Sequence, residues 1–165
     1  MTETLPKLVL EQVKPEYVGK VAKAILPLVE KACAYSGGRF SPDNVFEACA
    51  GLDPARKWYL WIVFDPHKAD VENFADRVKA VTVTALVDYP TGLRMGETIL
   101  IGGNGSSDEW LNYIDDLRDW AKKNGASRMQ YVGRRGWQRH MKPLGIEWKP
   151  VSTMFECELE DENGR

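Results

Sequence analysis

A glycine-rich loop between a strand-like and a helix-like segment is the feature that most constrains this chain. Residues 98–101 are apolar or β-branched and predict a strand, and residues 102–107 read Gly-Gly-Asn-Gly-Ser-Ser. From about Asp108 to Asn124, apolar side chains recur at helical spacing, which predicts a helix. A strand that enters a helix through glycines exposes backbone N–H groups, which often bind phosphate. The order predicts an anion site in a fold that combines strands with helices.

The chemistry of this loop does not match the strong phosphate-binding patterns. It lacks the lysine of GxxxxGK[ST] and the last glycine of GxGxxG. Asp108 and Glu109 stand where an anion would lie, and each like-charge contact at about 4–6 Å costs a few kcal/mol at an effective dielectric constant near 20. Ser106 and Glu109 also fit a helix capping box, which accounts for the acidic residues without a ligand. Both interpretations stay open.

Size and composition indicate an ordinary globular chain. Its 165 residues predict one domain over residues 1–159 and a polar tail over residues 160–165. The formal net charge of -2 gives no general attraction to nucleic acid or anionic membranes. No apolar run approaches the roughly 18–20 residues that cross a bilayer, and the N-terminus lacks a signal-peptide pattern. The scattered cysteines fit reduced thiols in a cytoplasm, and the two histidines lack a metal-ligand spacing, so no metal site is predicted.

Periodicity and turn residues predict the remaining elements. Pro27 is expected to kink or split the first helix. Helices interleave with strands, which favours an α/β (α+β) fold with a mixed sheet. Strands are expected at residues 8–13, 58–64, 81–87, 93–101, 127–132 and 151–159, and further helices at residues 15–36, 42–52, 71–78 and 136–142.

This order of elements is similar to that of the GNAT superfamily of acyl-CoA-dependent N-acyltransferases. Residues 102–107 lie where that family carries its pyrophosphate loop, and residues 134–146 lie where it has a short late helix. The phrases at residues 87–90, 109–111 and 133–137 look more like small GNAT-like proteins encoded by bacteriophages. The resemblance covers nearly the whole chain. It implies a mostly antiparallel sheet of six to seven strands flanked by helices, with acetyl-CoA as cofactor and an amine as acceptor.

The resemblance also implies where an acyl-CoA would bind. The strands at residues 93–101 and 127–132 are expected to separate at Ile101 and Met129, which would open a slot above Gly102. A basic patch around Trp137 could clamp phosphates, contact an acidic partner or form a solvated helix face, and it is too confined for a broad nucleic-acid footprint. The patch comprises Arg134, Arg135, Arg139, His140 and Lys142. The cofactor-binding candidates are Ile101, Gly102, Gly103, Asn104, Gly105, Ser106, Ser107, Arg134 and Trp137.

Acyl transfer to an amine also requires a base. Glu97 alternates in phase with Met95 and Ile99, which could place its carboxylate on an otherwise apolar face. A buried glutamate has a raised pKa and suits a general base, whereas an edge or surface glutamate has no such role. Tyr131 and His140 are the candidates for a general acid.

Two functions from different classes follow. The first is an N-acetyltransferase that uses acetyl-CoA and an unknown amine in the cytoplasm. The second is a non-catalytic GNAT-fold bacteriophage protein, in the host cytoplasm or the virion, whose partners are proteins of the phage particle or a second copy of itself. The family's [QR]-x-x-G-x-[GA] motif is absent, and Met141, which cannot donate a proton, stands at the position of the family's general-acid tyrosine. Both departures favour the second function.

Overall fold

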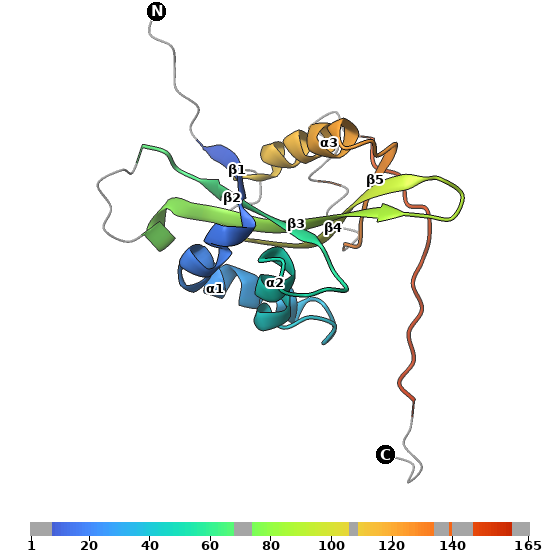
Figure 1. Ribbon diagram of the computed structural model, residues 1–165, viewed down its shortest axis with the longest axis horizontal. Coiled ribbons are helices and arrows are strands. Elements are labelled where there is room, and N and C mark those ends of the chain that lie inside the picture. The colour runs from blue at the N-terminus through green and yellow to red at the C-terminus, as the bar shows by residue number, and fades with distance from the viewer. Residues whose placement is uncertain (1–7, 68–73, 106–108, 134–138, 140–146, 160–165) are drawn as a thin grey trace, which may run out of the picture.

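Five strands form a single sheet in the order β1-β2-β3-β4-β5. The computed structural model describes residues 8–67, 74–105, 109–133, 139 and 147–159. Neighbouring strands are antiparallel except β4 and β5, which are parallel. Helices α1 and α2 cover one face and α3 covers the other (Figure 1). The strands are β1 (Val9–Val13), β2 (Trp58–Phe64), β3 (Val78–Asp88), β4 (Arg94–Gly103) and β5 (Arg128–Tyr131); the α-helices are α1 (Val18–Ala34), α2 (Pro42–Cys49) and α3 (Ile114–Lys123).

The sheet has an apolar core on each face, which explains why β2 is an uninterrupted apolar run. Alternate side chains of β2 point to opposite faces. Trp58, Leu60 and Ile62 join the core under α1 and α2, whereas Trp61 and Val63 join the core under α3. The Trp61 indole N–H donates to the Thr84 hydroxyl at 2.9 Å, so its buried polar atom is satisfied. Burial on both faces is why residues 58–64 are identifiable as a central strand from sequence.

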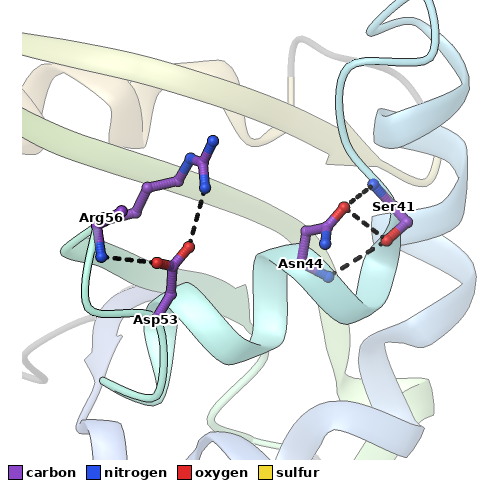
Figure 2. Close-up of polar contacts among 5 residues, drawn as sticks. Ser41, Asn44, Asp53 and Arg56 are labelled. Carbon is purple, nitrogen blue, oxygen red and sulfur yellow. Dashed lines mark hydrogen bonds and ion pairs between the residues drawn. The ribbon is translucent and has the colours of Figure 1, made fainter.

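The start of α2 is held by two side chains that form a capping box. The Ser41 hydroxyl accepts the Asn44 N–H at 3.3 Å, and the Asn44 side chain accepts the Ser41 N–H at 3.1 Å (Figure 2). After α2, the Asp53 carboxylate accepts the Ala55 N–H at 2.8 Å and a guanidinium N–H of Arg56 at 3.1 Å. These two bonds lower the pKa of Asp53. The capping box thus closes with asparagine in the place of the usual glutamate or glutamine.

One of the two outcomes predicted for the first helix, a split at Pro27, does not occur. Pro27 lies inside α1 and does not split it. The proline is on the exposed side of the helix, where water can bond the carbonyl that loses its partner. On the other side of the helix, Ile25, Leu28 and Val29 are buried and hold the helix against the sheet.

The prediction of six to seven strands is also wrong for the described residues, which contain five. Residues 151–159, expected to form a closing strand, have no regular secondary structure. Their large apolar side chains are exposed, Phe155 by 90% and Leu159 by 89%. β5 is an edge strand of only four residues, so pairing along it would leave most of these nine residues without a partner strand.

One further element was misplaced by the sequence pattern. Phe74–Arg77 forms a 3-10 turn, and Val78, expected to end a helix, begins β3. Residues 68–73 and the helix expected at residues 136–142, apart from Arg139, lie outside the described residues. Among the described helices, none is long and apolar enough to cross a membrane.

Candidate functional site

The two parallel strands part before β4 ends. β5 pairs with β4 over only four residues, from Met95 opposite Arg128 to Thr98 opposite Tyr131. β4 continues to Gly103 while remaining paired with β3 on its other side. The pairing therefore ends after Thr98 and Tyr131, where β5 ends, and not at Ile101 and Met129; the slot expected above Gly102 stays a prediction. Met129 lies within the paired region because the ladder places it opposite Gly96.

A β-bulge marks the point where the strands part. Thr98 is opposite Thr84 and Leu100 is opposite Val83, so Ile99 has no register partner in β3. Ile99 also lies beyond the last residue pair of β4 and β5. Ile99 and Leu100 both pack into the core under α1 and α2. An irregularity of this kind frees backbone groups that a regular ladder would use, and such bulges are common beside active sites.

Glu97 lies one residue before the end of the β4–β5 ladder, in a small polar cluster. Its carboxylate accepts the Tyr89 hydroxyl at 3.2 Å and a side-chain N–H of Gln130, the residue opposite it on β5. The glutamate is half-buried and lies opposite Ala85 of the core under α1 and α2. The negative charge of Glu97 raises the pKa of Tyr89, which stays a proton donor at neutral pH. The cluster fixes one carboxylate oxygen and leaves Glu97 at the edge of the gap.

Tyr131 ends β5 on the opposite face of the sheet. It packs with the core under α3 and contacts Trp148 edge to face at 4.8 Å between ring centroids. Burial raises the pKa of Tyr131, so its phenol is protonated at neutral pH. Glu97 and Tyr131 therefore lie near the same gap on opposite faces, and the structure does not bring them into contact.

The first two glycines of the loop are packing positions. A side chain at Gly102 would meet the Leu28 carbonyl oxygen of α1 at 2.3 Å, and one at Gly103 would meet the Trp110 ring at 2.6 Å. Gly105 has a φ of +71°, which L-residues with a side chain rarely adopt. Close approach of α1 and Trp110 therefore explains Gly102 and Gly103 without a ligand. Ile101 packs toward α3, and Asn104 is exposed.

The helix after the loop begins later than expected. α3 starts at Ile114, and Leu111–Tyr113 before it forms a 3-10 turn. Trp110 and Leu111 are consecutive and both buried, at 7% and 2% exposure. Burial of two adjacent side chains does not fit the apolar spacing of the α-helix, which begins after them. No α-helix N-terminus follows the loop directly within the described residues, so the predicted helix-terminus contribution to an anion site is wrong here.

A cation from another element reaches the loop instead. The Lys31 ammonium of α1 donates to the Gly103 carbonyl at 3.0 Å. Lys31 is exposed and lies where the loop leaves β4. The charge is of the sign that a phosphate requires. Glu109 also approaches the loop, with a carboxylate oxygen 3.9 Å from the position of a side chain at Gly105.

The remaining hollows do not add to this site. An apolar void of about 10 Å³ between the sheet and α3 could hold one water at most. A surface hollow of about 330 Å³ lies beside Trp120 on α3. No group of three or more potential metal-ligating side chains occurs among the described residues. Five sequence candidates lie outside those residues: Ser106, Ser107, Arg134, Trp137 and His140.

Sequence reasoning missed Ile99, Gln130 and Lys31. A bulge has no sequence pattern of its own, because Ile99 fits a regular strand equally well. Gln130 could have been found from the parallel register, had the end points of both strands been known. Lys31 looks like an ordinary basic residue in the last turn of a helix.

Comparison with known proteins finds similar solved structures but no similar family or sequence. No protein-family model and no curated protein sequence matches the chain. A probable acetyltransferase has a TM-score of 0.63 at 14% identity, with 93% of this chain and 99% of that chain covered. A predicted acetyltransferase from Clostridium acetobutylicum, solved with acetyl-CoA, has a TM-score of 0.57 at 12% identity, covering 90% and 96%. Glucosamine-6-phosphate N-acetyltransferase from Arabidopsis thaliana has a TM-score of 0.61 at 8% identity, covering 93% and 100%.

Another similar structure is described as a GNAT family acetyltransferase from Staphylococcus aureus. At such low identities the similarity shows the fold, which is the mixed α+β fold of GNAT acetyltransferases. The fold expected from the resemblance is therefore confirmed as a mixed α+β fold, and membership in the superfamily stays a prediction. The closer resemblance to bacteriophage proteins stays a prediction.

Proposed function

We propose that this protein is an N-acetyltransferase that uses acetyl-CoA, and that transfer takes place where β4 and β5 part. The observation that carries the proposal is Ile99, which has no register partner in β3 and lies beyond the ladder with β5. A backbone N–H freed at such a point can donate to an acyl oxygen as it becomes negative. Several solved structures with this fold are named as acetyltransferases, and one contains acetyl-CoA, which supports the proposal.

Acetyl-CoA would supply an acyl group already activated as a thioester. Glu97 takes the proton of an amine that approaches from the α1 and α2 face, with Gln130 and Tyr89 holding its carboxylate. Tyr131, a protonated phenol on the α3 face, is the candidate donor to the departing thiolate. A base and an acid on opposite faces suit a transfer in which the amine enters on one side and the thiol leaves on the other.

The cofactor phosphates would lie near the loop of residues 102–105 and Lys31. The Lys31 ammonium is already directed at this loop through the Gly103 carbonyl. Ser106, Ser107, Arg134 and Trp137 belong to the same proposed site through the family resemblance alone, as does His140 as a second candidate acid.

Calorimetric titration of the full chain with acetyl-CoA tests binding. We expect a dissociation constant in the micromolar range and about tenfold weaker binding in Lys31→Met, because one charge-assisted bond is lost. Lys20→Met is the matched control, since Lys20 is an exposed lysine on the same helix that lies over Tyr17. Absence of heat with up to millimolar acetyl-CoA would refute the proposal. Gly103 variants are unsuitable because they disturb Trp110.

Release of free CoA thiol in the presence of a panel of primary amines tests catalysis. Glu97→Gln should lower kcat by about 10²–10⁴-fold, the usual contribution of a general base, without a matching change in acetyl-CoA affinity. Glu11→Gln, on the exposed edge strand β1, is the control. Equal activity of the two variants would remove Glu97 from the reaction.

We propose the non-catalytic bacteriophage protein as a second candidate function. It is favoured by the contacts of Gly102 and Gly103, which account for both glycines without a cofactor. This function predicts a folded protein that neither binds acetyl-CoA nor releases thiol. Its location in host cytoplasm or virion would be tested by mass spectrometry of purified particles of a phage that encodes this chain.

A further inference from the structure

Thr82 carries a buried hydroxyl that contacts the backbone of the neighbouring strand at the β-bulge. Its side chain is 5% exposed, and the residue lies on β3 opposite Ile101 of β4. The hydroxyl donates to the carbonyl oxygen of Leu100 at 3.0 Å. Leu100 directly follows Ile99, the residue without a register partner in β3. A side chain of one strand therefore holds the backbone of the other at the point where the ladder is interrupted.

Packing alone does not require a hydroxyl at this position. The small void between the sheet and α3 is lined by Thr82 together with apolar and aromatic side chains, among them Leu10 and Val63. Valine is β-branched like threonine and would bring no polar atom into this core, whereas a buried hydroxyl costs free energy unless it is hydrogen-bonded. On the same strand, the Thr84 hydroxyl is accounted for by the indole of Trp61. The partner of the Thr82 hydroxyl is the bulge itself.

The strand register alone does not fix the shape of the bulge. Two residues of β4, Ile99 and Leu100, lie against one residue of β3, Val83, and the pairs on either side would be the same whichever of the two were opposite it. A peptide unit is planar and trans, so an anchored carbonyl fixes the orientation of the whole peptide that joins Leu100 to Ile101. The bond from Thr82 therefore selects one arrangement of the bulge.

We propose that Thr82 is a positioning residue for acyl transfer, whose hydroxyl holds the β-bulge of β4 in the shape that directs a backbone N–H toward the acyl oxygen. This inference rests on the proposed function, in which the bulge supplies that donor. Thr82 is enclosed between the sheet and α3, so it acts through Leu100 and not by contact with substrate. Misplacement of a reacting group by about 1 Å can lower a rate by about 10²-fold, so loss of the anchor should be visible in kcat.

Release of CoA thiol and calorimetric binding of acetyl-CoA, both measured on the full chain, test this role. Thr82→Val should lower kcat by about 10- to 100-fold and change the dissociation constant for acetyl-CoA by less than about threefold, because the donor is lost while the shape of the side chain is kept. Thr82→Ala, which also lacks the donor, should behave in the same way. Thr82→Ser, which keeps the hydroxyl, should retain most of the activity. Val63→Ala is the control, because it loosens the same void from β2 and leaves the Thr82 hydroxyl in place.

The free protein supplies a second readout that does not depend on activity. The amide and carbonyl NMR signals of residues 99–101 should shift more in Thr82→Val than in Thr82→Ser or Val63→Ala, because only the first loses the bond to the Leu100 carbonyl. With acetyl-CoA labelled at its thioester carbonyl, the infrared carbonyl stretch should fall on binding to the wild type and fall less on binding to Thr82→Val. A residue with a purely structural role would leave this stretch unchanged.

The outcomes separate this inference from the proposed function. Wild-type kcat in Thr82→Val, an equal loss in Val63→Ala, or no rescue by Thr82→Ser would overturn the role of Thr82 while leaving the acetyltransferase activity in place. A wild-type protein that neither binds acetyl-CoA nor releases thiol would refute the proposed function and, with it, the role of Thr82 in transfer. The anchoring of the bulge would then be decided by the NMR signals of residues 99–101 alone, and unchanged signals in Thr82→Val would refute it.

Discussion

Replacement of Gly102 by alanine should destabilise the protein more than any other glycine-to-alanine change in the described residues. The new methyl group would lie 2.3 Å from the Leu28 carbonyl oxygen and 3.2 Å from the Ala32 methyl. The first distance is about 1 Å shorter than an ordinary van der Waals contact. The obstructing atom belongs to the helix backbone, so no side-chain rotation relieves the contact. α1 must move away from the sheet.

The loss of stability can be estimated from the packing contacts between α1 and the sheet. Ile25, Leu28, Val29 and Ala32 of α1 are 0–4% exposed and face the sheet. A gap of 0.5–1 Å forfeits about a quarter to a half of the dispersion energy at each contact, and overpacked cores typically lose about 1–3 kcal/mol. We expect Gly102→Ala to lower the free energy of unfolding by about 3 kcal/mol, which corresponds to a decrease in Tm of roughly 6–12 °C at this chain length.

Urea unfolding followed by tryptophan fluorescence measures this change. Gly19→Ala is the matched control, because Gly19 lies in the same helix, is exposed and has no atom within 4 Å of the new methyl group. That variant should be more stable by about 0.8 kcal/mol, since alanine has the higher helix propensity. A loss below 1 kcal/mol in Gly102→Ala would refute the argument that α1 packs rigidly on this part of β4.

Three further outcomes are expected. At pH 8, dithionitrobenzoate should react promptly with one thiol per chain, because Cys157 is exposed whereas Cys33 and Cys49 are buried. C157S should remove this prompt reaction. Prompt reaction of a second thiol would contradict the described core. Burial raises the pKa of Cys49 to about 12 from 9.0, so above pH 9 only the unfolded state ionises there. Stability should therefore fall with rising pH, by about 1.4 kcal/mol from this residue between pH 8 and 10, and C49A should show a correspondingly smaller decrease in urea unfolding. Ser41→Ala should cost about 1 kcal/mol by removing the cap of α2, while Ser36→Ala, which removes a side-chain bond outside any helix cap, serves as the comparison.

The sequence predicted best where one physical signal dominated. β2 is apolar on both faces, so its limits at Trp58 and Phe64 coincide with the apolar run. The helix expected at residues 42–52 begins at Pro42 as predicted, because a serine that can cap a helix, followed by proline, has few other uses. Pro90 and Gly92, between the strands expected at residues 81–87 and 93–101, are typical turn residues, and Gly92 has a φ of +84° there.

The errors arose where tertiary contacts overrode local pattern. Helical spacing over residues 108–113 is genuine, but the burial of Trp110 against Gly103 takes precedence over it. Apolar and polar side chains also alternate along residues 151–159. Such alternation identifies the apolar side of a segment but does not identify the strand or helix against which that side packs. In the candidate site, Glu97 could be selected from its phase along β4, whereas its partners Tyr89 and Gln130 depend on pairing registers that no local pattern encodes.

The register of β3 and β4 does not require Ile99. If it were deleted, Leu100 would follow Thr98 directly, and the pairs Thr84–Thr98 and Val83–Leu100 would become successive rungs of an unbroken ladder. Every later side chain of β4 would keep its face, including Gly102 against α1. A variant that lacks Ile99 should therefore keep the same fold but lose the β-bulge of β4. The bulge is thus a local feature that the pairing of β3 with β4 does not require, although the Ile99 side chain adds to the core under α1 and α2.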